Sequence, residues 1–245
     1  MRALVCLMAA LTAPCAGAAA APLFTPPQGC KVYVTVQQKS CTVSHLFRCA
    51  GEADLQHRVD IGADGLAYVG TIDSETQWIE SASPLSGLVE RLAGAEDPAS
   101  FSGLLATGHD SFSFRTQTQV QGGGAFGMQY EGEDHLTGET LTLDGETLQG
   151  TRFKIIARDA TGQEIWRSEG EEFIHPTWRT FLAGRSTTTS ADGVDETDSS
   201  PLKFIFEGEA GFSSSAPAYG CGDAVSFLLP SGRADFPRPQ QIFPS

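Results

Sequence analysis

Apolar and polar residues alternate in short runs along most of the chain, and turn-forming residues separate the runs. Alternation with a period of two is typical of β-strands that bury one face. In the first part of the chain the predicted strands are 31–37, 42–48, 55–61, 66–72 and 75–81. In the second part they are 110–119, 126–136, 138–143, 146–159, 163–174, 177–189 and 201–206.

Tight turns between these runs favour antiparallel pairing of neighbours in the sequence, and a sheet this large flattens or curls. We therefore predict an all-β, mainly antiparallel fold, tied by disulfides and containing one or two short helices. Its sheet is expected to be a strongly bent meander or a partly open barrel. A two-sheet β-sandwich is the alternative.

Helical signals are confined to two segments before residue 110. Residues 96–108 form the better candidate, with Asp97 as N-cap, Pro98 at the first helical position and Gly108 as the stop. Residues 83–94 predict either a second short helix or an irregular crossing. We expect the helix at 96–108 to cover or plug part of the concave side of the sheet.

The ends of the chain differ in composition from the middle. Residues 1–20 resemble a secretory signal peptide, with one positive charge, a short apolar run and small residues that predict cleavage after Ala18 or Ala20. We expect a single β-rich domain at 21–230 and a flexible Pro-rich tail at 231–245. Residues 190–200 predict an acidic loop between two strands.

Cleavage of the signal would leave four cysteines, an even number in an oxidising compartment. If residues 31–48 form a hairpin with Lys39-Ser40 at its tip, Cys30 faces Cys49 and can form a disulfide. By exclusion, Cys41 is expected to join Cys221. The cysteine spacings match neither a structural zinc site nor a redox motif, so we predict no metal at the cysteines.

The formal charge of −14 leaves no basic patch for phosphates, which argues against nucleic acid as a partner. Beyond the signal, no apolar run approaches the roughly 20 residues of a membrane-spanning helix. We therefore expect an exported protein, periplasmic or secreted, that does not span a membrane.

Catalytic and cofactor motifs are weak. Residues 122–127 match a dinucleotide-binding glycine pattern, but a strand rather than a helix follows them. Glu133, Asp134 and His135 supply acid–base groups, yet consecutive strand residues point in opposite directions. The acidic loop lacks the pattern of a calcium-binding EF-hand. We predict no catalytic residue, no metal and no cofactor.

Large apolar side chains in amphipathic strands suggest a ligand site, because a curved sheet can turn some of them into its concavity. The candidate ligand-binding residues are Trp78, Phe153, Ile155, Trp166, Trp178 and Phe181. We expect a non-enzymatic protein that binds a lipid, another apolar or amphipathic ligand, or an envelope protein. The alternatives are an envelope scaffold without a ligand cavity and a hydrolase using His57, His135 or His175.

Overall fold

The computed structural model describes residues 23–222. The expected signal peptide at 1–20 and the expected flexible tail at 231–245 lie outside the described residues. Within the described part of the chain, no helix is long and apolar enough to cross a membrane.

All strands belong to one 13-stranded antiparallel sheet, which confirms the predicted bent meander. Strands β1 to β12 follow one another in sequence order, and β13 returns to pair with β1. The strands are β1 Cys30–Gln38, β2 Val43–Cys49, β3 Leu55–Gly62, β4 Gly65–Asp73, β5 Trp78–Ser83, β6 Leu88–Asp97, β7 His109–Val120, β8 Ala125–Leu143, β9 Glu146–Asp159, β10 Glu164–His175, β11 Thr180–Ser190, β12 Gly193–Asp198 and β13 Pro201–Ile205. The sheet is not closed, so β12 and β13 form its edges.

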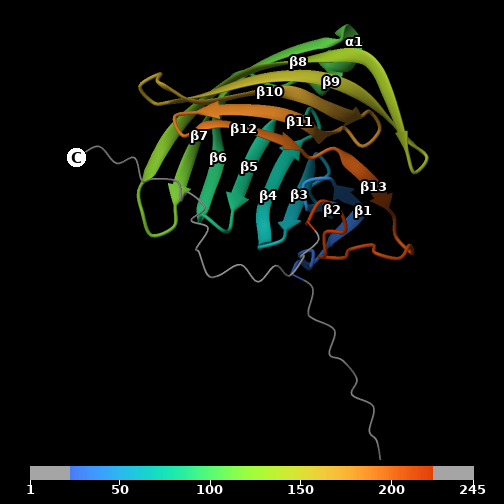
Figure 1. Ribbon diagram of the computed structural model, residues 1–245. Coiled ribbons are helices and arrows are strands. Elements are labelled where there is room, and N and C mark those ends of the chain that lie inside the picture. The colour runs from blue at the N-terminus through green and yellow to red at the C-terminus, as the bar shows by residue number, and fades with distance from the viewer. Residues whose placement is uncertain (1–22, 223–245) are drawn as a thin grey trace, which may run out of the picture.

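The sheet is strongly curved, and Figure 1 shows the long strands β8 to β10 arching over the shorter strands β1 to β5. The curvature gives the sheet two arms, the first strands β1 to β5 and the later strands β7 to β11, and the inner faces of these arms pack together at one end of the molecule. Val34 and Leu46 from the first strands meet Leu148, Leu182 and Phe204 there, all nearly or completely buried. This cluster holds the arms together without closing the hydrogen-bonded sheet.

The outer face of β1 to β4 carries a second apolar cluster, which includes Val43, Val59 and Ile61. Phe24 and Phe212 pack over it from the two ends of the described chain. Backbone amides of the C-terminal segment also donate to the side chains of the first strand, as from Ser213 to Thr35 Oγ1 and from Ala218 to Gln37 Oε1. Residues 207–222 therefore form a cover over the outer face, here called the C-terminal strap.

Both predicted disulfides are present, Cys30–Cys49 and Cys41–Cys221. Cys30 lies directly opposite Cys49 as expected, but the register shifts between Val32 and Val34. The hairpin tip is accordingly longer than the expected Lys39-Ser40 pair and includes Cys41, which has a positive φ of 53°. A bulge in β1 compensates for the extra tip residue, so the pairing at the cysteine end is unchanged.

The helical predictions need correction. The predicted helix or irregular crossing at 83–94 is wrong, because residues 88–97 form β6 and pair with both β5 and β7. The better candidate is a helix, α1 Phe101–Thr107, and Gly108 ends it in a left-handed conformation as expected. Its N-cap is Ser100 rather than Asp97, since the Ser100 hydroxyl accepts from the Gly103 amide and Asp97 ends β6.

Two predicted interruptions also lie inside the sheet. The acidic segment 190–200 is not a loop, because its residues continue β11 and form the edge strand β12. The Thr137-Gly138 turn expected between two strands is a bulge within the single strand β8. In both cases cross-strand hydrogen bonding overrides local turn signals, and Gly138 absorbs the bulge with a φ of 80°.

The turn between β10 and β11 connects the two arms at the end near α1. The Arg179 side chain donates to the Ser74 carbonyl, to Glu75 Oε1 at 2.6 Å and to the Ser102 hydroxyl. Its guanidinium also lies 5.0 Å from the ring centroid of Phe101 in α1. One residue thus connects the β10–β11 turn, the β4–β5 turn and the start of the helix.

A second junction lies where the sheet edges meet. The Lys39 ammonium is 3.0 Å from Asp198 Oδ2, and the Ser199 amide donates to the Gly184 carbonyl. On β13, the Phe204 amide donates to Asp144 Oδ2 from the β8–β9 turn. Carboxylates therefore help to hold the edge strands in place.

We expect Arg179→Ala to lower the free energy of unfolding by roughly 2–3 kcal/mol, because it removes the donor to the Ser74 carbonyl and the cation beside Glu75, which keeps only its hydrogen bonds from Ser102. Urea unfolding followed by fluorescence measures this. Arg91→Ala is the control, since Arg91 forms an exposed pair with Glu80 that should be worth less than about 1 kcal/mol. Equal effects of the two substitutions would contradict the bridging role of Arg179.

We expect the double substitution Cys41→Ser with Cys221→Ser to release the C-terminal strap. The chain-entropy model assigns about 5 kcal/mol to this long loop and about 3 kcal/mol to the short Cys30–Cys49 loop. Hydrogen exchange should become faster at the Ser213 and Ala218 amides. The matched loss of Cys30–Cys49 should leave those amides protected, and continued protection without Cys41–Cys221 would refute the pinning role of that bridge.

Candidate functional site

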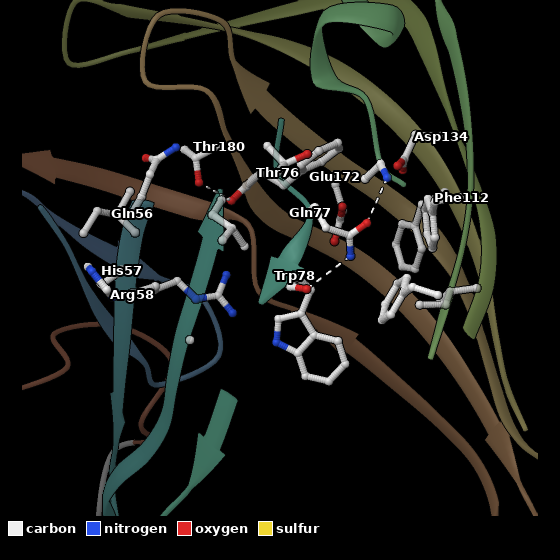
Figure 2. A pocket seen from close by; sticks show the side chains of 18 of the residues that line it. Gln56, His57, Arg58, Thr76, Gln77, Trp78, Phe112, Asp134, Glu172 and Thr180 are labelled. Carbon is white, nitrogen blue, oxygen red and sulfur yellow. Dashed lines mark hydrogen bonds between the residues drawn. The ribbon is translucent and has the colours of Figure 1, made fainter. Parts of the chain in front are cut away.

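The curved sheet forms a partly open cavity of about 380 Å³ between β2 to β5 on one side and β7 to β11 on the other. Figure 2 shows side chains from both arms converging on it. The lining residues are Leu46, Gln56, His57, Arg58, Tyr68, Gly70, Ile72, Thr76, Gln77, Trp78, Ala99, Phe112, Phe114, Asp134, Phe153, Ile155, Glu172, Thr180 and Phe181. The volume falls within the range of roughly 300–1,000 Å³ that small-molecule sites occupy.

One wall of the cavity is aromatic. Trp78 packs edge-on against Phe114 at 5.7 Å between ring centroids, and against Tyr130 at 5.5 Å. The Phe112 ring lies over Gly132, where any Cβ would collide with it. This glycine on β8 therefore keeps the aromatic wall flat enough to leave room in the cavity.

The opposite wall is polar and comes from β3 and β4. Arg58 lies 3.2 Å from Asp60 Oδ2 and 5.0 Å from the centroid of the Tyr68 ring. The Tyr68 ring in turn covers Gly70, since a Cβ there would collide with it. Figure 2 shows Arg58 extending into the cavity while the ring of His57, its neighbour in β3, points away.

Two carboxyl groups lie across the cavity from Arg58. Glu172 follows a register shift between β10 and β11, next to Gly170 and Gly184, where the two backbones approach too closely for any side chain. The extra residue of this bulge belongs to β11, where Gly184 and Arg185 together oppose Glu171. Asp134 lies on β8 and is buried. Because β10 pairs with β9 without a shift at this point, alternation puts Glu172 on the same face of the sheet as Phe153 and Ile155 of β9, which line the cavity.

The environment of these carboxyls disfavours their charged forms. Burial, and then the neighbouring Asp134 carboxyl, raise the pKa of Glu172 to about 8, although Arg58 opposes the shift. Burial and the Asp110 carboxyl similarly raise the pKa of Asp134 to about 7. Glu172 is therefore mostly uncharged at neutral pH.

The carboxyl groups of the cavity wall outnumber its cationic groups. Arg58 is the one arginine or lysine among the cavity-lining residues of the described chain, and it already pairs with Asp60. Glu172 and Asp134 therefore lack a cation of their own. Chemically, the site offers an apolar surface for a hydrocarbon or ring and carboxyl groups for a hydrogen-bond donor or a cation.

Four of the six predicted ligand-binding residues, Trp78, Phe153, Ile155 and Phe181, line the cavity. The other two lie elsewhere. Trp166 packs beside Tyr130 in the aromatic core, and Trp178 stacks on His175 with 3.8 Å between ring centroids.

Sequence reasoning missed the polar wall and the carboxyls. The available signal was the alternation of Gln56, Arg58 and Asp60 with apolar residues in β3. Such a polar set is ordinarily assigned to the solvent-facing side of a strand.

Each of the three histidines considered for hydrolysis pairs with a carboxylate, and His57 also belongs to the residues that line the cavity. His57 Nε2 is 2.8 Å from Glu52, and His175 Nε2 is 2.9 Å from Glu146. His135 lies 3.3 Å from Glu133 on an exposed face.

Comparisons of the chain with protein-family models, with curated proteins and with solved structures find no match. The functional argument therefore depends on the geometry of the cavity.

Replacing Glu172 by Gln should change the pH dependence of stability. The folded state keeps a proton on Glu172 up to about pH 8, whereas the unfolded chain releases it near 4.5, so this residue reduces stability as pH rises between those values. We expect Glu172→Gln to stabilise the fold by roughly 4 kcal/mol near pH 8 and to have little effect near pH 4.5.

Urea unfolding across this pH range tests the expectation. Glu169→Gln is the matched control, because Glu169 lies on the same strand and is exposed. A stability difference from wild type that stays constant with pH would contradict the assignment of a raised pKa to Glu172.

Proposed function

We propose that this protein is an exported, non-enzymatic binding protein that holds a small amphipathic molecule in the cavity of its curved sheet. The observation that carries the proposal is the division of the cavity into an aromatic wall and a polar wall. An amphipathic ligand has the same division, so it can satisfy both walls at once.

The apolar part of the ligand is assigned to the wall around Trp78, Phe112 and Phe114. These rings are held by neighbouring aromatic residues and by the glycine beneath Phe112, so they offer a largely preformed surface. Burial of hydrocarbon against such a surface contributes roughly 25 cal/mol per Å² removed from water. Preformed walls also reduce the ordering cost of binding.

The polar part of the ligand is assigned to the carboxyl groups opposite Arg58. Asp60 already neutralises Arg58, while Glu172 and Asp134 have no cationic partner in the cavity wall. An amine would place a positive charge beside these carboxyls, which favours their charged forms, and would supply several N–H donors. A ligand carboxylate would instead add a further negative charge next to Asp60 and Asp134. We therefore assign a cationic, amine-like head group to the ligand.

The location assigned to the protein is the periplasm or another extracytoplasmic space. Two disulfides persist most readily in an oxidising compartment, and the first 20 residues carry the features of a secretory signal. The ligand would therefore be a molecule of the envelope or of the surrounding medium.

Titration with octylamine, octanol and octanoate, three probes with the same chain and different head groups, tests the proposal. We expect octylamine to bind most tightly and octanoate most weakly, as measured by calorimetry and by fluorescence of the cavity tryptophan Trp78. Glu172→Gln should weaken octylamine binding by roughly tenfold and leave octanol binding unchanged, because it removes one charge-assisted contact.

Glu169→Gln serves as the control, since its exposed carboxyl lies on the same strand but outside the set of cavity-lining residues. Tighter binding of octanoate than of octylamine would refute the assigned head group. Absence of saturable binding for all three probes would refute the ligand-binding function itself.

A further inference from the structure

A second cluster of chemically reactive side chains lies on β7 and β8. His109 and His135 are directly opposed across the two strands, and their ring centroids are 4.3 Å apart. Glu133 precedes His135 by two residues and so projects from the same face of β8. The three side chains are therefore gathered by strand register rather than by a flexible loop.

The distances within the cluster suit a metal ion. Glu133 Oε2 is 3.3 Å from Nε2 of His135 and 3.8 Å from Nε2 of His109. One ligand atom from each residue lies within 4.8 Å of the other two. Tetrahedral zinc with bonds of about 2.1 Å needs ligand atoms about 3.4 Å apart. Small side-chain rotations would bring all three atoms to that spacing.

The chemistry of the cluster favours a transition metal over calcium or magnesium. Two imidazoles and one carboxylate form a mixed nitrogen and oxygen donor set, whereas calcium and magnesium prefer oxygen alone. The three side chains are between 42% and 50% exposed, so an ion can reach them from solvent. A fourth position would remain open for water or another ligand.

The cluster is separate from the cavity. Asp134 stands between Glu133 and His135 and faces the cavity, so its two neighbours project from the opposite side of β8. The site beside them is a groove of about 490 Å³ that also includes Arg152 and Lys154. These cations, opposite His135 and Glu133 in the register of β9, face the open side of the cluster.

We propose that His109, Glu133 and His135 bind a divalent transition metal ion on the outer face of β7 and β8, and that this ion is zinc. The ion keeps an open coordination position beside the groove. Arg152 and Lys154 weaken the attraction for a bare cation and favour an anionic fourth ligand at that position. The other cluster of potential ligands in the described chain, Cys49, Glu52 and His57, is excluded because Cys49 is bonded to Cys30.

Calorimetry with zinc chloride on full-length, tag-free and chelator-treated protein tests the proposal. We expect one zinc ion per chain. His109→Ala and His135→Ala should each weaken binding by at least roughly tenfold, because loss even of a second-shell partner costs about 10–100-fold in affinity. The double substitution should abolish binding at micromolar zinc.

Glu131→Gln is the matched control for Glu133→Gln, since Glu131 is exposed two residues earlier on the same strand. We expect Glu133→Gln to weaken zinc binding and Glu131→Gln to leave it unchanged. Excess magnesium should not compete. Circular dichroism of each variant without zinc checks that the fold is intact.

Two results would overturn the proposal. One is the absence of saturable zinc binding to the wild-type protein. The other is one-to-one binding that persists in the folded double variant, which would place the ion elsewhere. Because the cluster projects away from the cavity, neither result depends on the outcome of the amine titrations.

Discussion

At the end of the sheet near α1, the curved interior depends on one contact, the docking of the β10–β11 turn against the opposite arm of the sheet. An open sheet has no hydrogen bonds to fix its curvature around a ring, so packing must do so. Arg179 provides donors to the β4–β5 turn and to α1, while Arg48 of β2 donates to the Trp178 carbonyl. The His175 ring accepts from the Trp178 amide through Nδ1, so its Nε2 carries the proton toward Glu146. The distance between the two cavity walls follows from this junction.

Strand β3 has its expected faces reversed, and this reversal gives the cavity its chemistry. Val59 and Ile61 of β3 face outward, whereas Gln56 and Arg58 face the interior. The outward apolar face stays dry because Phe24 and the C-terminal strap cover it. A polar cavity wall is thus possible only because chain segments outside the sheet bury its other side.

Most strands and the Cys30–Cys49 pairing could be predicted from the sequence because both depend on local pattern, and Cys41–Cys221 then follows by exclusion. Alternation identifies a strand, and hairpin register places Cys30 opposite Cys49. The polar wall could not be predicted, since alternation in β3 does not say which face is inside when both faces are covered. The position of Glu172 could not be predicted for the same reason, since alternation in β10 does not say which face meets the cavity, and the pairing of β6 depends on two neighbouring strands. These features depend on tertiary packing, which the local periodicity of the sequence does not determine.

The acidic run in β12 has a consequence for how separate molecules meet. As an outermost strand, β12 exposes one row of unpaired backbone groups, and such a row can template the addition of a second chain. Asp195 and Glu196 place two exposed carboxylates on this short strand, whereas Asp198 pairs with Lys39 and Arg185. Two copies approaching edge to edge would bring like charges together before any hydrogen bond forms between them. The acidic residues of β12 therefore disfavour aggregation through the open edge of the sheet by electrostatic repulsion.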